Sequence, residues 1–376
     1  MSLLSYIIWN ADPEIFTIPI FDRPVRWYGL LFALGFLVSQ QIMFYIYRTE
    51  RKPEKDVETL TVFMVIATIL GARLGHVFFY EPDKYLSNPI DILKIWEGGL
   101  ASHGAAFGIL FALWLYTRYD VNWKLQFKRV TRPGQNYFQV VDRIVIVVAI
   151  TGCLIRFGNF MNSEIYGVPT NSDYGVVYAR NMSEYLTRAN RPIEEISYEQ
   201  DKSREIAENG SSPVIIKAAF KNIPDQLNEA TISTYLGNSF KSVLRQSEHF
   251  EPGEGPLEYE LSKNENGAFT AEVKTFAVPR HPTQLYESMT SLLIGVLLFI
   301  IWVKMKNRTP SGLLLGLFLI LLFGLRFVHE IFKENQVSFE DELTFNMGQI
   351  LSIPLIIAGV VIFVRALTIK EDHEAI

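Results

Sequence analysis

Long apolar runs alternate with short basic loops along this chain, and one long polar stretch separates the fourth run from the fifth. A helix that crosses a lipid bilayer needs about 20 mostly apolar residues. Seven runs approach that length, and the third is the weakest because it is rich in Gly and Ala: 28–47, 60–80, 100–116, 142–161, 283–303, 312–331 and 345–367. The pattern predicts an all-α polytopic membrane protein with about seven transmembrane helices.

Basic residues are distributed unequally between the two sides of the predicted helices. Loops 48–58, 118–141 and 304–311 and the tail from 365 hold fourteen Lys and Arg, whereas the N-terminus, loop 81–99 and loop 332–344 hold five. Short cytoplasmic loops of membrane proteins carry the excess of basic residues. The distribution therefore predicts an N-terminus outside the membrane and a C-terminus in the cytoplasm.

The long polar stretch has its own secondary-structure signals. Two alternating runs, LEYEL and FTAEV, flank the turn signal Asn266-Gly267 and predict a β-hairpin. Ahead of them, STYLGNSFKSVLRQ has the apolar spacing of an amphipathic helix. We expect a small α+β extracytoplasmic insert domain at 168–279, between helical parts at 1–167 and 280–376. A disordered loop is the alternative.

Composition removes several function classes. The 376 residues carry a net charge of −5 and no basic tract or zinc-finger spacing, so nothing supports nucleic-acid binding. Cys153 is the one cysteine and lies in an apolar run, which favours a packed hydrophobic side chain. There is no P-loop or Rossmann fingerprint, so we expect no nucleotide cofactor. Asp12, Glu14 and Asp22 make the N-terminus unlike a cleavable signal peptide.

Ionisable and amide side chains occur in or beside four of the predicted spans. Such groups are costly at membrane depth, so they usually face a partner or a cavity. The second span carries Arg73 and His76, the third begins with His103, the fourth carries Arg156, Asn159, Asn162 and Glu164, and the sixth carries Arg326, His329 and Glu330. Their number predicts a polar cavity between the helices.

The spacing of these residues suggests what the cavity binds. Arg156 and Asn159 lie three residues apart and share one helix face, which Asn162 continues. Arg326 and Glu330 share a face of the sixth span in the same way. An arginine stays charged and its fork matches phosphate geometry, so two arginines from different helices suggest a lipid phosphate.

A structural role is the alternative for each arginine. Asp142, Glu164, Glu287 or Glu330 could neutralise it in an interhelical ion pair. The histidines do not have HxxxH or HExxH spacing, so we expect no metal site.

Six strings along the chain carry a family resemblance. RFGNFMNSEIYG, from Arg156 to Gly167, is the most specific, and the others are RWYGLLFALGF, GARLGHVFFYEP, GGLASHGA, RHPTQLYES and GLRFVHEIFKEN. As an ordered set they resemble the prolipoprotein diacylglyceryl transferase family and its seven-span layout, skipping roughly residues 171–278. The chain departs from the family pattern at Ile155 and Ala105, where Gly is usual, and at Leu322, where Tyr is usual.

The resemblance implies a cofactor-free transferase of the bacterial cytoplasmic (inner) membrane. Such enzymes move the diacylglyceryl group from phosphatidylglycerol to the lipobox cysteine thiol of a preprolipoprotein and release glycerol 1-phosphate, the first step of lipoprotein maturation. By the same resemblance, His103 is the candidate base, and Arg156 and Arg326 are the candidate phosphate-binding residues. Six further residues match positions that are important in the family and are substrate-binding candidates: Tyr28, Asp142, Asn159, Glu164, Gly167 and His281. Asn162 and Glu330, from the polar helix faces, are also substrate-binding candidates.

The implied chemistry is consistent with these residue types. A thiol with a pKa of about 8.5 must lose its proton, and a neutral imidazole with a pKa of about 6.5 can accept it. The departing phosphate gains charge in the transition state, where fixed cations stabilise it most.

Three other functions stay open at this point. A membrane transporter of an anionic solute or lipid would also use intramembrane arginines, although no internal repeat is evident. An intramembrane hydrolase would need a Ser–His or paired-Asp site, but Ser102 and His103 are sequence neighbours and GxSxG does not occur. A non-catalytic scaffold would use the insert for binding. The preferred lipoproteins, the insert's role, the oligomeric state and the group that deprotonates the thiol are also open.

Overall fold

A computed structural model of the chain describes residues 5–19, 22–95, 98–121, 126–172, 174–222, 227–264, 267–334 and 344–368. The chain divides into two compact units. The first unit comprises residues 1–31, 156–287 and 328–346. The second unit comprises residues 32–155, 288–327 and 347–376.

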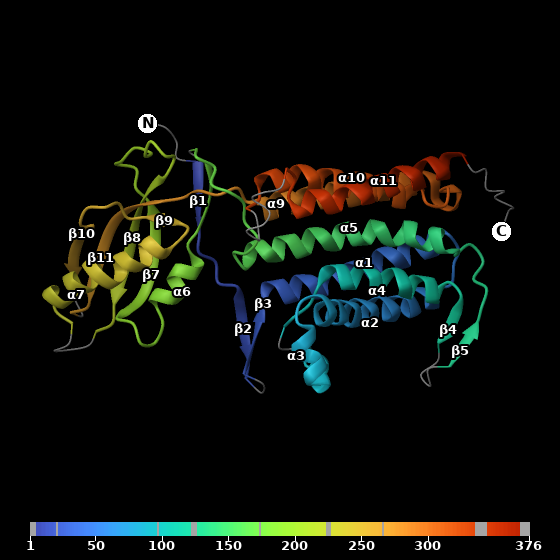
Figure 1. Cartoon of the computed structure of the whole chain (residues 1–376), viewed down its shortest axis with the longest axis horizontal. Helices are drawn as coiled ribbons and strands as arrows, with labels where there is room; N and C mark the ends of the chain where they lie inside the picture. The colour runs from blue at the N-terminus through green and yellow to red at the C-terminus, as the bar shows by residue number, and fades with distance from the viewer. Residues whose placement is uncertain are drawn as a thin grey trace. The chain divides into compact units, whose positions relative to one another are not determined.

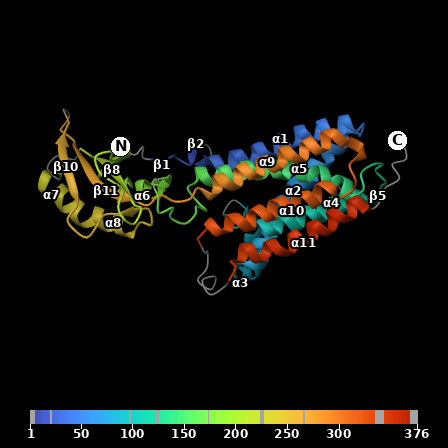
Figure 2. The same cartoon turned by 90° about the horizontal axis from the view of Figure 1, so that it is seen from above.

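Long apolar helices dominate the structure and run alongside one another (Figure 1, Figure 2). They are α1 (Trp27–Thr49), α2 (Glu54–Phe79), α4 (Ser102–Tyr116), α5 (Tyr137–Met161), α9 (Thr283–Met305), α10 (Leu313–His329) and α11 (Met347–Thr368). In the part of the chain that the structure describes, six segments are long and apolar enough to cross a membrane. The structure therefore fits the predicted polytopic helical membrane protein, but it is not all-α outside the polar stretch, because it also contains short two-stranded sheets.

The third predicted span corresponds to the shortest of these helices. α4 has 15 residues, fewer than about 20 that a span ordinarily needs. It packs closely on α2 through small residues. A Cβ atom added to Gly75 would lie 2.6 Å from the Cα atom of Gly104, so the two backbones approach as small-residue helix pairs do. A count of seven spans stays a prediction.

A buried charge cluster ties three segments of the second unit together. One carboxylate oxygen of Glu50 accepts hydrogen bonds from Nε (3.0 Å) and Nη2 (2.7 Å) of Arg143 and from the indole N–H of Trp302 (2.7 Å). Its other oxygen lies 2.6 Å from Nζ of Lys52. The Glu50 side chain has no exposed surface, so this carboxylate depends on its partners for stabilisation.

Short elements complete the description of the chain. β1 (Ser5–Trp9) pairs in parallel with β6 (Tyr174–Tyr178), and β2 (Glu14–Ile18) pairs with β3 (Arg23–Arg26). β4 (Tyr119–Val121) pairs with β5 (Phe127–Arg129). α3 (Pro82–Ser87) and a 3₁₀ helix (Pro89–Leu93) follow α2.

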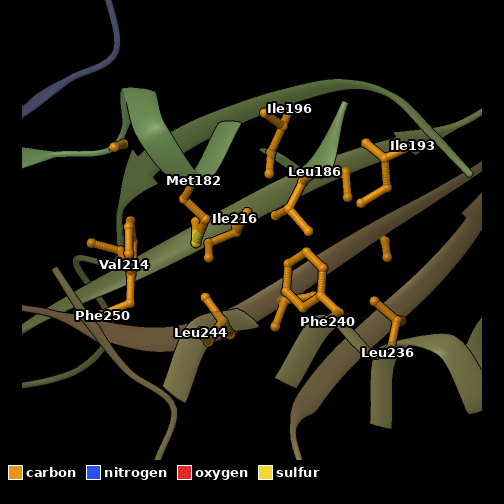
Figure 3. Close-up of a cluster of buried hydrophobic side chains, with 14 of the residues drawn as sticks. Met182, Leu186, Ile193, Ile196, Val214, Ile216, Leu236, Phe240, Leu244 and Phe250 are labelled. Carbon is orange, nitrogen blue, oxygen red and sulfur yellow. The ribbon is translucent and has the colours of Figure 1, made fainter. Parts of the chain in front are cut away.

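The polar stretch folds into an antiparallel sheet with helices packed against it. The strand order is β10 (Glu258–Lys263), β11 (Phe269–Ala277), β8 (Ser212–Phe220) and β7 (Ile193–Gln200), with β9 (Phe250–Glu251) pairing with β11. The helices are α6 (Arg180–Leu186), α7 (Glu229–Tyr235), a π-helical segment (Leu236–Phe240) and α8 (Lys241–Gln246). Figure 3 shows the core, one buried cluster that includes Leu236, Phe240 and Leu244 of the helical run and Val214 and Ile216 of β8.

Both local predictions for this stretch are confirmed. β10 and β11 pair as the expected hairpin, with Glu258 opposite Lys274. The expected amphipathic helix is the run from α7 to α8, which buries Ile232, Leu236 and Phe240. The predicted turn residue Asn266 lies outside the described residues.

Candidate functional site

The segment after α5 is held by backbone hydrogen bonds to two distant parts of the chain. Gly167 N–H donates to the carbonyl of His281 (2.9 Å), and Val168 N–H donates to the carbonyl of Phe332 (2.9 Å). Gly167 also forms an isolated β-bridge with Lys333. The specific motif found in the sequence therefore ends in a three-way backbone junction within the first unit.

Gly167 sits at that junction without room for a side chain. A Cβ atom there would overlap the carbonyl oxygen of Phe332 and would lie 2.8 Å from Cγ2 of Thr283 and 2.9 Å from Cβ of His281. Real Cβ atoms essentially never approach other atoms this closely. The structure thus gives a steric reason for glycine at this position.

The amides of the motif converge on one carboxylate. Nδ2 of Asn159 donates to Oε1 of Glu164 at 2.8 Å, and Nδ2 of Asn162 donates to the same oxygen at 3.3 Å. Nε2 of Gln284 donates to the backbone carbonyl of Glu164 at 2.6 Å. The structure therefore brings three of the predicted site residues together at the end of α5.

Arg156 forms the ion pair that was the structural alternative in the sequence. Its Nε lies 2.7 Å from Oε2 of Glu287 on α9, and the arginine side chain keeps 27% of its surface exposed. The structure gives Arg156 no second hydrogen-bond or ion-pair partner within the described part of the chain. The two terminal amino groups of the guanidinium can therefore donate to an incoming oxyanion while Nε stays on Glu287.

Lys333 joins this network and was not among the candidates from the sequence. Its Nζ lies 2.6 Å from Oε1 of Glu287 and 3.1 Å from Oε1 of Glu330, and its side chain is 7% exposed. The i,i+3 spacing from Glu330 to Lys333 could have revealed the second pair, but the pair with Glu287 joins segments far apart in the sequence. Two cations, Arg156 and Lys333, and two carboxylates, Glu287 and Glu330, thus form one connected cluster.

Arg280 is a second residue that the sequence analysis passed over, although it opens the RHPTQLYES string. It is 5% exposed and donates to the Gly167 carbonyl (3.2 Å), to the Glu248 carbonyl (3.2 Å) and to the Glu334 carboxylate. It therefore connects the junction at Gly167 with the segment before β9.

His281 and Tyr28 belong to the same unit, and both are partly buried. Nδ1 of His281 lies 3.2 Å from the hydroxyl of Tyr286, and burial lowers the pKa of His281 below its ordinary value. The neutral imidazole is therefore its dominant form near pH 7. Tyr28 lies against α5, because a Cβ on Gly158 would be 3.0 Å from Cδ2 of Tyr28.

The remaining candidates belong to the second unit. Asp142 is fully buried, and its oxygens accept the N–H groups of Gly312 (2.7 Å) and Leu315 (2.8 Å) at the N-terminus of α10. These contacts cap a helix, and a substrate-binding role for Asp142 stays a prediction. His103 is the second residue of α4, with its ring 5.0 Å from that of Phe79. Arg326 lies in α10, and its meeting with Arg156 at one phosphate stays a prediction.

The described part of the chain contains no group of three or more His, Cys, Asp or Glu side chains that could hold a metal ion. Cys153 is half-buried, and its sulfur lies 3.2 Å from the hydroxyl of Ser288.

Comparisons with known proteins cover almost the whole chain. The family model described as prolipoprotein diacylglyceryl transferase matches residues 13–365. The chain is 34% identical to the phosphatidylglycerol–prolipoprotein diacylglyceryl transferase of Tolumonas auensis, over 97% of this chain and 98% of that protein. It is 31% identical to the enzyme of that name in Chloroherpeton thalassium and 32% identical to that in Porphyromonas gingivalis, each over 97% of this chain and 96% of the relative. The chain belongs to the prolipoprotein diacylglyceryl transferase family.

Proposed function

We propose that this chain transfers the diacylglyceryl group of phosphatidylglycerol to the cysteine thiol in the lipobox of a preprolipoprotein signal peptide. The products are a thioether-linked lipoprotein precursor and glycerol 1-phosphate. Family membership supports the reaction class, and the names of the relatives support both substrates. We place the reaction in the bacterial inner membrane, where both substrates are available.

The observation that carries this proposal is the set of contacts that Arg156 makes. Its Nε is engaged by Glu287, while its terminal amino groups have no partner among the described residues. Such a fork is oriented before substrate arrives, which lowers the entropy lost when it binds a phosphate. Asn159, Asn162 and Glu164 add amide and carboxylate groups one to two turns along the same helix end. These groups can bind the hydroxyls of the glycerol headgroup.

The proposed reaction is a displacement at the glyceryl carbon that bears the phosphate. The thiol proton passes to the imidazole of His103, and the sulfur forms a C–S bond to that carbon. The C–O bond to phosphate breaks at the same time, and its electron pair remains on the departing oxygen. Arg156 and Arg326 stabilise the second negative charge that appears on the leaving glycerol phosphate. Tyr28, His281 and Glu330 are proposed to line the substrate path.

We further propose the arrangement of the chain in the membrane. Six candidate spans together with α4 make seven, with the N-terminus outside and the C-terminus in the cytoplasm. The short loops support this orientation, because loops 48–58, 118–141 and 304–311 and the tail hold fourteen Lys and Arg, whereas the N-terminus, loop 81–99 and loop 332–344 hold five. Residues 168–279 then form an extracytoplasmic insert domain between the helical parts 1–167 and 280–376.

The direct test uses purified protein, phosphatidylglycerol vesicles and a synthetic lipobox peptide. Arg156→Ala should lower kcat/KM by about 10²-fold or more, by analogy with the loss of one oxyanion donor. Arg48→Ala is the matched control, because Arg48 is an exposed arginine paired with Glu54. Release of glycerol phosphate should require the peptide thiol, whereas a transporter would not catalyse a thiol-dependent release. Wild-type turnover by folded Arg156→Ala protein would contradict the proposal.

A further inference from the structure

Arg73 of α2 is a buried cation with no acidic partner in the part of the chain that the structure describes. It is 2% exposed, and its guanidinium lies 4.7 Å from the centre of the Tyr85 ring. All of its hydrogen bonds go to backbone carbonyls: Nε to Ile92 (2.8 Å), Nη1 to Gly98 (2.7 Å) and Gly99 (3.3 Å), and Nη2 to Asp91 (2.6 Å) and Lys94 (3.2 Å). We call this set of contacts the carbonyl clamp.

The carbonyl clamp uses the full donor capacity of the side chain. A guanidinium has five N–H donors in a rigid plane, and here five carbonyl oxygens accept them. A lysine has three donors at one point and could not reproduce this pattern. The geometry therefore serves to fix the path of a chain segment rather than to neutralise an acid.

The segment held by the carbonyl clamp contains two adjacent glycines whose backbone is intrinsically flexible. Gly98 and Gly99 have positive φ values of 90° and 71°, and two successive glycines allow many other backbone conformations. Gly99 also has no space for a side chain, since a Cβ there would lie 2.6 Å from Cδ2 of His76 and 2.9 Å from Nη1 of Arg73. Arg73 and His76 together therefore define where this glycine pair lies.

The glycine pair leads directly into the start of α4. Ala101 N–H donates to the carbonyl of Ala72, the neighbour of Arg73, at 2.9 Å. α4 begins at Ser102, so His103 stands in its first turn. The imidazole then packs on Phe79 and Tyr80 of the same α2 end, with ring centroids 5.0 and 5.9 Å apart. Both ends of the segment 98–103 are thus anchored on α2.

We propose that Arg73 is a positioning residue that sets the place of the His103 imidazole through the carbonyl clamp. The inference rests on the proposed function, in which His103 accepts the thiol proton. Loss of the clamp frees the glycine pair and lets the first turn of α4 shift. A shift of about 1 Å at a reacting group can cost about 10²-fold in rate. Arg156, the proposed phosphate-binding residue, lies on another helix, α5, so its role should be unaffected.

The first experiment separates kcat from KM in the full-length purified enzyme. Arg73→Met, which keeps an unbranched apolar stem as far as the position of Nε but has no donors, should lower kcat by about 10- to 100-fold and leave KM for phosphatidylglycerol within about twofold. Arg73→Lys should fall between wild type and Arg73→Met. Gly99→Ala keeps Arg73 but crowds its Nη1, so it should lower kcat similarly and covers the case in which Arg73→Met does not fold.

A double-mutant cycle then tests whether Arg73 acts through His103. In a His103→Gln background, Arg73→Met should lower the remaining kcat by less than about twofold, because the group it positions is already absent. The same fold loss in both backgrounds would overturn the inference, as would a raised KM with unchanged kcat. Full activity of His103→Gln alone would remove the base role and the inference with it. The Arg156 experiment tests the transfer reaction separately.

Discussion

Gly167→Ala is the substitution whose effect follows most directly from the structure. The new methyl group would overlap the Phe332 carbonyl oxygen and would lie 2.8 Å from Cγ2 of Thr283 and 2.9 Å from Cβ of His281. Ordinary contacts of this kind begin near 3.4 Å, so two neighbours must each retreat by about half an ångström. The backbone oxygen can move only by breaking its hydrogen bond from Val168 N–H (2.9 Å).

The expected cost has a structural and a catalytic part. Overpacking of a filled site costs about 1–3 kcal/mol in the free energy of unfolding. The displaced junction also carries Glu164 and Lys333, which contact the amides and carboxylates around Arg156. A displacement of about 1 Å there should lower kcat/KM by about 10²-fold. Activity should therefore fall much more than thermal stability does.

The assay compares glycerol phosphate release with thermal unfolding in detergent. Gly237→Ala is the matched control, because a Cβ at that helical glycine meets nothing within 4 Å. It should leave activity unchanged and, since alanine favours helix, leave stability unchanged or raised. If Gly167→Ala and Gly237→Ala gave equal kcat/KM, the steric reasoning would be refuted.

Two further predictions concern stability. Glu50→Gln should lower the free energy of unfolding by about 3–5 kcal/mol, because it leaves Arg143 and Lys52 buried without their carboxylate. Glu54→Gln changes an exposed pair and should leave the free energy of unfolding nearly unchanged. Burial, with the nearby Arg280, lowers the pKa of His249 from 6.5 to about 4, so acid favours the unfolded state, which takes up the proton. The free energy of unfolding of the polar stretch should therefore fall by about 2 kcal/mol between pH 7.5 and pH 5.

Denaturant unfolding in detergent measures the first difference, and equal midpoints for Glu50→Gln and Glu54→Gln would contradict it. Hydrogen exchange of the core amides of β8 and β11 measures the second. His249→Gln cannot take up a proton in this range, so it should remove most of the acid sensitivity. The same acid sensitivity in that variant would mean that other groups cause it.

The helices and the local elements could be predicted because their signals are local. Apolar length identified all of the long helices, and the alternation in LEYEL and FTAEV identified the β10–β11 hairpin. α4 is the exception in length. Its Gly and Ala residues allow the close contact with α2, and the helix ends after 15 residues. The Gly and Ala content of this segment indicated a surface for close helix packing, but it did not predict the length of α4.

The site could be predicted only in part, because its decisive contacts join distant segments. Helix spacing placed Arg156 beside Asn159, yet no local pattern identifies Glu287 of α9 as the partner of both Arg156 and Lys333. Arg73 was noticed as a buried charge, but its partners are backbone carbonyls, which every residue has. Sequence patterns therefore located Arg156 and Arg73 without their partners, and they missed Lys333 and Arg280.

The charge balance around Arg156 suits the proposed reaction better than a cluster of unpaired cations would. Glu287 and Glu330 offset Arg156 and Lys333, so these four side chains carry little net charge before substrate binds. The lipid phosphate has one negative charge and the leaving glycerol phosphate has two. In the proposed reaction, donors oriented by Glu287 would gain most from the charge that develops during C–O cleavage, and the rate would depend on that difference rather than on tight lipid binding. The same carboxylates then compete with the dianion for Arg156 and Lys333, which favours its release.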